Sequence, residues 1–388
     1  MNCEVNKTEV VCFSSKNYEE VPRSFLLGQN TIQLVDSSKA LGIIIDRKLN
    51  FKDHGISVYN NLIYKWVTIC RSCNRNWGLN HLVLSRISKT VLFSLVFYGC
   101  SVWMNDINMK PIDRLWCKIA KTAVGAIFNV NQSILEVILG IPPLDIQRRV
   151  INVKHYLKAL SLDRNTDQYL DFIISEYSKQ NPFVVNMIKE VGKFFLWKLE
   201  HDPDSFSDAD RLTIQNRQFD SLHLLTNLAY SKKMMNQYTE YLWQMTLNNR
   251  LMLMGERRAP TVSTRPIPLP LGTNRKTEVL MISLLYKQNL LNSFLYLSQR
   301  NRCPSPLCKC LKEEQTAYHI ISSCELVDEG MRRRIDKLLN SFNGGSVEGV
   351  PADYISILNC IRNDEFVKIC LEIVEIKNLE LKSVYIIS

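Results

Sequence analysis

The chain has 388 residues, of which 46% are apolar and 22% are charged, so it is long enough to bury a core and to divide into more than one unit, and disorder is excluded as the default state. Lysine and arginine outnumber aspartate and glutamate by 48 to 38, which gives a net charge of +10. A field of this sign attracts phosphate groups or anionic lipid and says little about the fold.

The N-terminal residues and the cysteines favour a reducing compartment. Residues 1–11 lack the apolar run of a secretory signal. The longest uncharged apolar run, 90–104, is too short to span a bilayer, so we expect it to form a buried helix. Most of the twelve cysteines are scattered, and four cluster near His319, which favours one metal site over a disulfide framework. We therefore expect an intracellular protein of the cytoplasm and nucleus with no membrane association.

Strand formers open the chain and helices follow. The segment 8–13 (TEVVCF) predicts a strand, and 31–46 predicts two strands joined around Asp36-Ser37-Ser38. Apolar residues then recur at helical spacing within 59–73, 82–102 and 112–127, which predicts three helices. A short helix from Asn131 or Ser133 should stop at Gly140, because two prolines follow it.

Helices also dominate the rest of the chain. The pattern from 145 to 200 is helical with a break at Pro182, the acidic stretch 200–210 predicts a loop, and another helix covers 238–254. Four prolines within 257–275 predict an extended linker. Further helices are expected over 278–297, 329–342 and 364–381.

Four residues form the motif C-x-C-x8-H-x4-C: Cys308, Cys310, His319 and Cys324. Three thiolates and an imidazole in so short a segment suit tetrahedral Zn²⁺, and four protein ligands would make the ion structural. Cys303 lies nearby, but Pro304 and Pro306 stiffen the intervening chain, so we expect it to take no part. The alternative is a loop with free cysteines, because the first pair is closer than is usual in zinc modules.

Other charged residues suggest no catalytic site. The aspartates of the 200–210 stretch are interpreted as a solvated loop rather than a metal site, because no glycine lies at the loop centre; they are Asp202, Asp204, Asp208 and Asp210. Arg332–Arg334 either clamp nucleic acid or pair with nearby acidic residues. The histidines outside the motif lack a paired serine, cysteine and aspartate pattern, so no residue is assigned a catalytic role.

Five segments, in order along the chain, resemble landmarks of reverse transcriptases from jockey-like and related LINE elements, which are non-LTR retrotransposons. They are Asn6–Glu9 with VVCF, similar to the strand called motif D; LGIIID at 41–46 with Leu49, Phe51 and His54, similar to a hairpin; Tyr98-Gly99 with Trp103, similar to a "YG … W" helix; LGIPPL at 139–144, similar to the segment after the thumb; and SPLCKC at 305–310 with Glu314–Thr316 and His319, similar to a zinc knuckle. Residues 160–275 contain no landmark.

The resemblance implies an order of domains. Residues 1–54 would be the end of the palm, 55–145 thumb-like helices, 146–256 a helical middle region, 257–275 a Pro-rich linker, 276–325 a helix with the zinc knuckle, and 326–388 C-terminal helices. The expected fold class is predominantly α, with a small N-terminal antiparallel β element at the palm edge, a helical thumb and middle region, and a C-terminal zinc knuckle.

The chain departs from the family at the polymerase site. That site needs an earlier aspartate and a Tyr/Phe-x-Asp-Asp turn to hold two Mg²⁺ ions, and both precede motif D, where this chain begins. The sequence contains no Asp-Asp pair, so two-metal phosphoryl transfer lacks its ligands. We expect Mg²⁺ only in a full-length parent and no polymerase activity in this chain alone.

Basic residues concentrate on the thumb-like helices. Between Gly55 and Gly125 nine basic residues stand against two acidic ones. Five of the nine are interleaved with aromatic residues and are interpreted as phosphate contacts: Lys65, Arg71, Arg75, Arg86 and Lys89. For any one of them, a solvated helix face is the alternative.

We therefore expect a truncated RNA-directed DNA polymerase of a non-LTR retrotransposon that lacks the catalytic aspartates and still binds RNA or an RNA–DNA duplex, with target DNA as a further partner. One alternative is a non-catalytic adaptor whose helical middle region binds a protein partner and whose zinc site is only a staple. Weak salt dependence of nucleic-acid binding would favour it. Another alternative is a pseudogene product without a stable fold.

Overall fold

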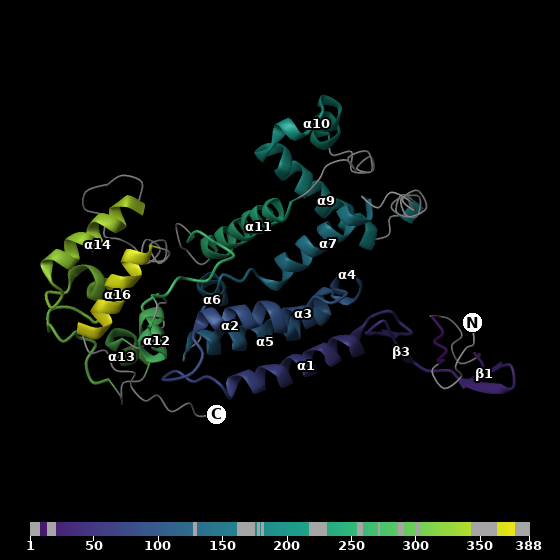
Figure 1. Cartoon of the computed structure of the whole chain (residues 1–388), viewed down its shortest axis with the longest axis horizontal. Helices are drawn as coiled ribbons and strands as arrows, with labels where there is room; N and C mark the ends of the chain where they lie inside the picture. Colours follow the sequence, from purple (N-terminus) through teal and green to yellow (C-terminus); the bar gives the residue numbers. More distant parts are fainter. Residues whose placement is uncertain are drawn as a thin grey trace. The chain divides into compact units, whose positions relative to one another are not determined.

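The computed structural model describes residues 8–13, 21–126, 130–160, 175–176, 179, 182–216, 231–253, 259–270, 272–285, 291–298, 303–342 and 363–376. The chain divides into two compact units, Met1–Gly125 and Ala126–Ser388 (Figure 1). Among the described residues, helices predominate and the paired strands lie near the N-terminus. The expected fold class, predominantly α with a small antiparallel β element, is confirmed.

Two short hairpins form the β element. Strand β1 (Ser24–Leu27) pairs with β2 (Asn30–Gln33), and β3 (Ser37–Ala40) pairs with β4 (Ile43–Asp46), both antiparallel. The predicted turn at residues 36–38 is wrong, because the tight turns lie at Gly28 and at Leu41-Gly42, whose positive φ angles suit two-residue turns. Of the strand predicted over 8–13, only Val10 pairs, in a single bridge to Leu34.

Helices complete the first unit. They are α1 (Lys52–Cys70), α2 (His81–Ile87), a π-helical turn (Ser88–Leu92), α3 (Phe93–Val96), α4 (Cys100–Trp103) and α5 (Asp106–Val124). Figure 1 shows α1 and α5 side by side, and α5 also contacts α2. The core between them contains fully buried Leu84, Val96 and Trp116. Asn105 caps the start of α5, and left-handed Gly125 ends it.

Composition predicted one buried helix over the apolar run 90–104, and this prediction is wrong. The run is divided between the π-helical turn, α3 and α4, with a turn at Tyr98-Gly99. Gly99 has φ +59°, and a Cβ there would lie 2.5 Å from Cδ1 of Ile43. The left-handed backbone at this position favours glycine and breaks the helix where the β3–β4 hairpin approaches. No described helix is long and apolar enough to cross a membrane.

A helical core opens the second unit. Its helices are α6 (Gln132–Leu139), α7 (Leu144–Leu160), α9 (Pro182–His201), α10 (Asp208–Gln215) and α11 (Lys232–Met252). Helix α6 begins at its cap Asn131 and ends at left-handed Gly140, which confirms the prediction for that segment. Helices α7, α9 and α11 share an apolar core that includes Phe194, Tyr238 and Trp243.

The acidic stretch 200–210 is more ordered than the predicted loop. It contains the end of α9, a 3₁₀ turn over Pro203–Ser205 and the start of α10. The Ser207 hydroxyl accepts a hydrogen bond from the Asp210 amide, and the Asp210 carboxylate accepts one from the Ser207 amide. This reciprocal pair is a capping box, so Asp210 begins a helix.

Residues 259–270 are extended, as their prolines predict, but they pack within the second unit. The Ile267 amide donates to the Ile138 carbonyl at 3.0 Å, and Ile267 is fully buried. The Thr264 amide donates to the Glu240 carboxylate at 2.8 Å. The segment therefore joins α6 to α11 through contacts that composition does not reveal.

The C-terminal helices surround the cysteine cluster. They are α12 (Arg275–Ser283), α13 (Asn292–Ser298), a π-helical turn (His319–Ser323), α14 (Glu329–Phe342) and α16 (Asp364–Ile376). The single helix predicted over 278–297 is wrong, since α13 starts anew where the Asn292 amide donates to the Gln315 side chain. The helix ends predicted at 127, 254 and 377–381 lie outside the described residues.

Candidate metal centre and basic helical surface

The four predicted ligands meet in one place: Cys308, Cys310, His319 and Cys324. Their ligand atoms all lie within 4.8 Å of one another. The Sγ atoms of Cys308 and Cys324 are 3.8 Å apart, which is about the separation of two thiolates on a tetrahedral Zn²⁺ with bonds of about 2.3 Å. Among the described residues, these four form the group that could hold a metal ion, and the aspartates of 202–210 do not form a second such group. The cluster could hold a metal ion.

A short loop and a π-helical turn bring the ligands together. The Cys308 amide donates to the Glu313 carbonyl, and the Leu311 amide donates to the Cys308 carbonyl, both at 2.8 Å. Leu311 has φ +63°, which lets the chain reverse between the second cysteine and Glu313. The Cys324 amide then donates to the His319 carbonyl and closes the turn.

His319 is oriented for metal binding by its second ring nitrogen. Nδ1 lies 2.7 Å from Oε2 of Glu313 and 3.0 Å from Oγ of Ser323. These contacts leave Nε2 facing the cluster, 3.2 Å from Sγ of Cys310. A carboxylate on the outer nitrogen fixes the tautomer and the ring orientation of a metal-binding histidine. Glu313 is therefore a supporting residue that the motif alone did not identify.

Hydrogen bonds prepare Cys310 for metal binding. Hydrogen bonds, first from the Lys312 amide and then from the Glu313 amide, His319 and Cys308, lower the pKa of Cys310 from 9.0 to about 6. A thiolate at neutral pH is the metal-binding form. Cys303 remains outside the cluster, with its Sγ 3.1 Å from the Ser305 carbonyl oxygen.

The arginines after the knuckle make local ion pairs. Arg333 pairs with Glu329 at 2.7 Å, and Arg334 pairs with Glu365 at 3.1 Å, which joins α14 to α16. Both pairs are exposed. Of the two alternatives for this run, these contacts favour local pairing over a phosphate clamp.

Asp46, at the end of the LGIIID landmark, organises the loop before α1. Its carboxylate accepts hydrogen bonds from the amides of Lys48 at 3.0 Å, Asn50 at 3.3 Å and Phe51 at 2.5 Å. Leu49 and Phe51 both have positive φ, and such a tight path requires an internal acceptor. The buried carboxylate is thus occupied by backbone donors and has a structural role.

Other landmark residues pack onto the same hairpin. The Tyr98 hydroxyl donates to the Leu41 carbonyl at 2.7 Å. The His54 ring stands edge-on to Trp103 at 4.9 Å and accepts a hydrogen bond from the Ile44 amide. Burial, aided by Lys39, lowers the pKa of His54, and its Nδ1 carries no proton because it accepts the hydrogen bond from the Ile44 amide. The two landmarks between 41 and 103 therefore form one packed junction.

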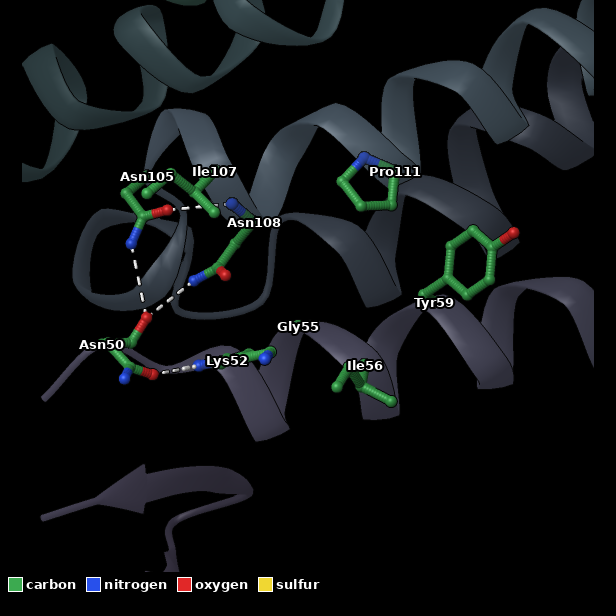
Figure 2. A pocket seen from close by; sticks show the side chains of 9 residues that line it. All are labelled: Asn50, Lys52, Gly55, Ile56, Tyr59, Asn105, Ile107, Asn108 and Pro111. Atoms are coloured by element: carbon green, nitrogen blue, oxygen red, sulfur yellow. Dashed lines mark hydrogen bonds between the residues drawn. The ribbon is translucent and has the colours of Figure 1, made fainter. Parts of the chain in front are cut away.

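Asparagines fasten this junction to α5. In Figure 2 the side-chain nitrogens of Asn105 and Asn108 both point to the Asn50 carbonyl, at 3.4 and 2.9 Å. Nδ2 of Asn108 also donates to the Trp103 carbonyl at 3.1 Å. The loop that Asp46 holds is thus tied to the start of α5.

The LGIPPL landmark also has a structural explanation. Gly140 has φ +61°, and a Cβ there would lie 2.2 Å from the Arg265 carbonyl carbon. The Gln147 side chain donates to the Pro142 carbonyl at 2.7 Å. Only glycine lets the 259–270 segment cross at this point. Of the motif D segment, residues 6 and 7 lie outside the described residues.

The five residues predicted to contact phosphate lie on or after α1 and within the α2–π region. Lys65, Arg71 and Arg86 are exposed, whereas Arg75 and Lys89 are half-buried. In the part of the chain that the structure describes, no ion pair engages Lys65, Arg71 or Arg86. Their charges are therefore available to an external anion.

Helix α5 carries further basic residues that were not singled out. Lys110, Arg114 and Lys118 recur every four residues, which places them along one side of the helix. All three are exposed, and within the described residues none makes an ion pair. The i, i+4, i+8 spacing was the signal in the sequence that could have identified them.

Comparison with known proteins points to a mobile genetic element. The chain is 22% identical over 130 residues to the "Retrovirus-related Pol polyprotein from type-1 retrotransposable element R1" of Bradysia coprophila. It is 20% identical over 161 residues to the "Putative 115 kDa protein in type-1 retrotransposable element R1DM" of Drosophila melanogaster. The matches cover 32% and 40% of this chain but only 13% and 16% of those proteins.

No protein-family model matches the chain, and no solved structure matches it significantly. The similarity to R1 polyproteins supports a retrotransposon-related origin.

Proposed function

We propose that this chain is a nucleic-acid-binding part of a non-LTR retrotransposon reverse transcriptase, with the end of the palm, the thumb and a zinc knuckle. The order of the five landmarks and the similarity to R1 polyproteins support this proposal. The partners would be RNA or an RNA–DNA duplex, and target DNA. The observation that carries the proposal is the group of basic side chains without ion pairs on the helices that follow the landmark junction.

Electrostatics explains why that group matters. Between Gly55 and Gly125, six exposed basic residues have no ion pair within the described residues: Lys65, Arg71, Arg86, Lys110, Arg114 and Lys118. Lysine and arginine side chains that neutralise phosphates release the counterions condensed on the nucleic acid, which favours binding. The only acidic residues between Gly55 and Gly125 are Asp106 and Asp113. This surface therefore favours a polyanion.

Polymerase activity is not part of the proposal. The sequence contains no adjacent aspartates, and the carboxylate of Asp46 is engaged by three backbone amides. Two-metal phosphoryl transfer needs carboxylates that are free to bind Mg²⁺. We expect no primer extension by the purified chain with Mg²⁺ or Mn²⁺, and sustained incorporation after removal of contaminants would contradict this part.

We propose Zn²⁺ as the ion of the cysteine cluster. Three thiolates and one imidazole suit zinc, and their closed arrangement makes the ion structural. Elemental analysis should find one zinc per chain in the parent and none after Cys308→Ser with Cys324→Ser. Cys303→Ser, the matched control outside the cluster, should keep its zinc. Substoichiometric metal in the parent, or retention in the double variant, would exclude this site.

A salt titration tests nucleic-acid binding. The variant replaces five basic residues with glutamine: Lys65, Arg71, Arg75, Arg86 and Lys89. Its affinity for an RNA–DNA duplex should fall at every sequence tested, and each lost phosphate contact should reduce the salt slope by about one unit. Arg333→Gln with Arg334→Gln, which alters paired arginines, is the control and should change neither quantity. Unchanged affinity and slope in a folded five-residue variant would remove the proposal's physical support.

A protein-interaction adaptor is the second candidate. Met245 and Met252 lie seven residues apart on α11, and both are exposed, as is the neighbouring Leu253. Flexible apolar side chains on one helical face suit a protein partner. In that case the zinc ion would only stabilise the fold. Nucleic-acid binding that is absent or nearly independent of salt would favour the adaptor.

A further inference from the structure

A pocket opens between the first turns of α1 and α5. It has a volume of 390 Å³, within the range of small-ligand sites. Figure 2 shows its apolar walls, with Ile56 and Tyr59 from α1 and Ile107 and Pro111 from α5. The side chains of Ile56 and Ile107 are 49% and 76% exposed, so the walls are accessible from solvent. The pocket can receive a flat apolar group from outside.

The floor of the pocket presents a hydrogen-bond acceptor. Nδ2 of Asn108 donates to the carbonyls of Asn50 and Trp103, which fixes the amide so that Oδ1 faces away from both. Asn108 is 8% exposed, and a Cβ added at Gly55 would lie 3.5 Å from this oxygen. Within the described residues, no group donates to Oδ1. This oxygen is not among the fully buried atoms that lack a partner, so it is open to a ligand, and such an acceptor favours a ligand with an N–H group.

Proline adds a second acceptor beside the first. Pro111 has no amide hydrogen, so the carbonyl of Ile107 lacks its usual helical donor. Both residues line the pocket. The rim also carries Lys52, which is exposed and makes no ion pair in the described part of the chain. The pocket thus combines apolar walls, acceptors and a cation.

The same face of α5 continues into the basic residues. At 100° per residue, Ile107, Pro111, Arg114 and Lys118 lie within about 60° of one another around the helix axis. Arg114 is about 4.5 Å beyond Pro111 along the axis, and Lys118 is about 10 Å beyond it. A ligand that fills the pocket and carries a chain of negative charges would therefore meet both cations.

We propose that this pocket holds one unpaired nucleobase of a bound strand whose neighbouring phosphates follow Arg114 and Lys118. The base would lie against Tyr59 and Pro111 and donate an N–H group to Asn108. Every nucleobase has a π-face and an N–H donor, so the site reads an unpaired base and not its identity. This inference rests on the proposed nucleic-acid binding and assigns that function a specific site.

Abasic nucleotides separate base recognition from phosphate binding. Two labelled RNA–DNA duplexes are compared, one with a four-nucleotide single-stranded extension and one in which these four nucleotides are abasic. Their charges are equal, so phosphate contacts alone would give equal affinities. We expect the parent protein to bind the base-bearing extension about tenfold more tightly, the effect of one base–aromatic contact. Fluorescence anisotropy at fixed salt gives both affinities.

Two variants locate the base. Ile107→Ser and Tyr59→Ala should each reduce the ratio of the two affinities toward one. Ile107 is exposed, so its replacement by serine should leave the fold intact. Tyr64→Ala is the matched control, because Tyr64 is an exposed residue of α1 outside the pocket. Arg114→Gln with Lys118→Gln should weaken both complexes equally and lower the salt slope by about two units.

The outcomes distinguish the two proposals. If the parent binds both duplexes tightly with equal affinity, the pocket holds no base, while nucleic-acid binding stands. If the ratio persists in folded Ile107→Ser and Tyr59→Ala, the base is recognised elsewhere and this site is wrong. If neither duplex binds in low salt, both proposals fall. Only a tenfold ratio that disappears with the pocket variants supports the site.

Discussion

Replacing Asp46 with alanine tests the structural role of a landmark aspartate. The substitution removes three hydrogen bonds from backbone amides to one buried carboxylate. The Phe51 amide lies on a half-buried residue, so loss of its charge-assisted bond at 2.5 Å should cost about 1.5–3 kcal/mol. Lys48 and Asn50 are exposed, and water can replace the acceptor at about 0.5 kcal/mol each. The sum is about 3 kcal/mol.

Hydrogen exchange is the appropriate assay, because two compact units need not unfold in one transition. A local loss of about 3 kcal/mol corresponds to about a hundredfold faster exchange of the amides of 48–55. Asp46→Asn should give an intermediate effect, since an amide keeps one acceptor oxygen and places a donor against the other amides. Exchange in peptides from α9 and α11 should not change.

Asp36→Ala is the matched control. Asp36 contacts Arg47 at 3.7 Å, and its side chain is 79% exposed, so the pair should contribute less than about 1 kcal/mol. If the hydrogen-exchange rates of the amides of 48–55 in Asp46→Ala stay within a factor of three of the parent rates, the carboxylate does not stabilise this loop. The structural explanation of the landmark would then be wrong.

Three further predictions concern Gly140 and the cysteine cluster of the second unit. Gly140→Ala should lower the free energy of unfolding of this unit in urea by more than about 2 kcal/mol, because φ is positive and the new Cβ would lie 2.2 Å from the Arg265 carbonyl carbon. A change below about 0.5 kcal/mol would contradict the close approach of segment 259–270 to Gly140. In metal-free protein Cys310 should react with iodoacetamide at pH 7, because its pKa is lowered to about 6. Cys70 should not react, because burial and Cys73 raise its pKa to about 11. Ionisation of Cys310 therefore stabilises the metal-free fold above pH 9, and this stabilisation decreases as the pH falls to 6. Removal of the metal by a chelator should lower the melting temperature, and added Zn²⁺ should restore it; a melting curve indifferent to both would argue against a structural ion.

The cysteine–histidine cluster could be predicted because its four residues are close in sequence. Cys308 and Cys324 are separated by sixteen positions, so residue type and spacing were sufficient. Glu313 lies between them and was not identified, because many side chains in such a loop could reach the outer nitrogen of a histidine. Only the fold shows that this carboxylate lies 2.7 Å from His319.

The junction around Asp46 could not be predicted from local patterns. Its contacts join distant positions, such as Tyr98 to Leu41 and Asn108 to Asn50. Strand propensity located the β residues but placed the turn wrongly, since a left-handed leucine at position 41 is not favoured by composition. The hydroxyl of Tyr98 on its carbonyl supports that turn and is invisible in a short window.

Composition also predicted a basic region and an extended segment, but not which surface is basic or where the segment packs. The excess of basic residues in 55–125 was evident and the spacing of Arg114 and Lys118 suggested one face, but only the fold shows which side of α5 is buried and leaves that face exposed. Prolines predicted that 259–270 is extended. They did not predict that Ile267 is buried against α6, because proline restricts the backbone and does not determine where it packs.

Asp46 and the pocket proposed to hold a base belong to one set of contacts. Asp46 accepts from the Asn50 amide, and the Asn50 carbonyl in turn accepts from Asn108, whose remaining oxygen forms the pocket floor. An aspartate after a strand invites assignment as a metal ligand, yet the oxygens of Asp46 already accept three backbone hydrogen bonds. A loss of nucleic-acid binding on substitution of Asp46 would therefore reflect loss of the loop that positions Asn108, and such a variant cannot serve as a test for catalysis.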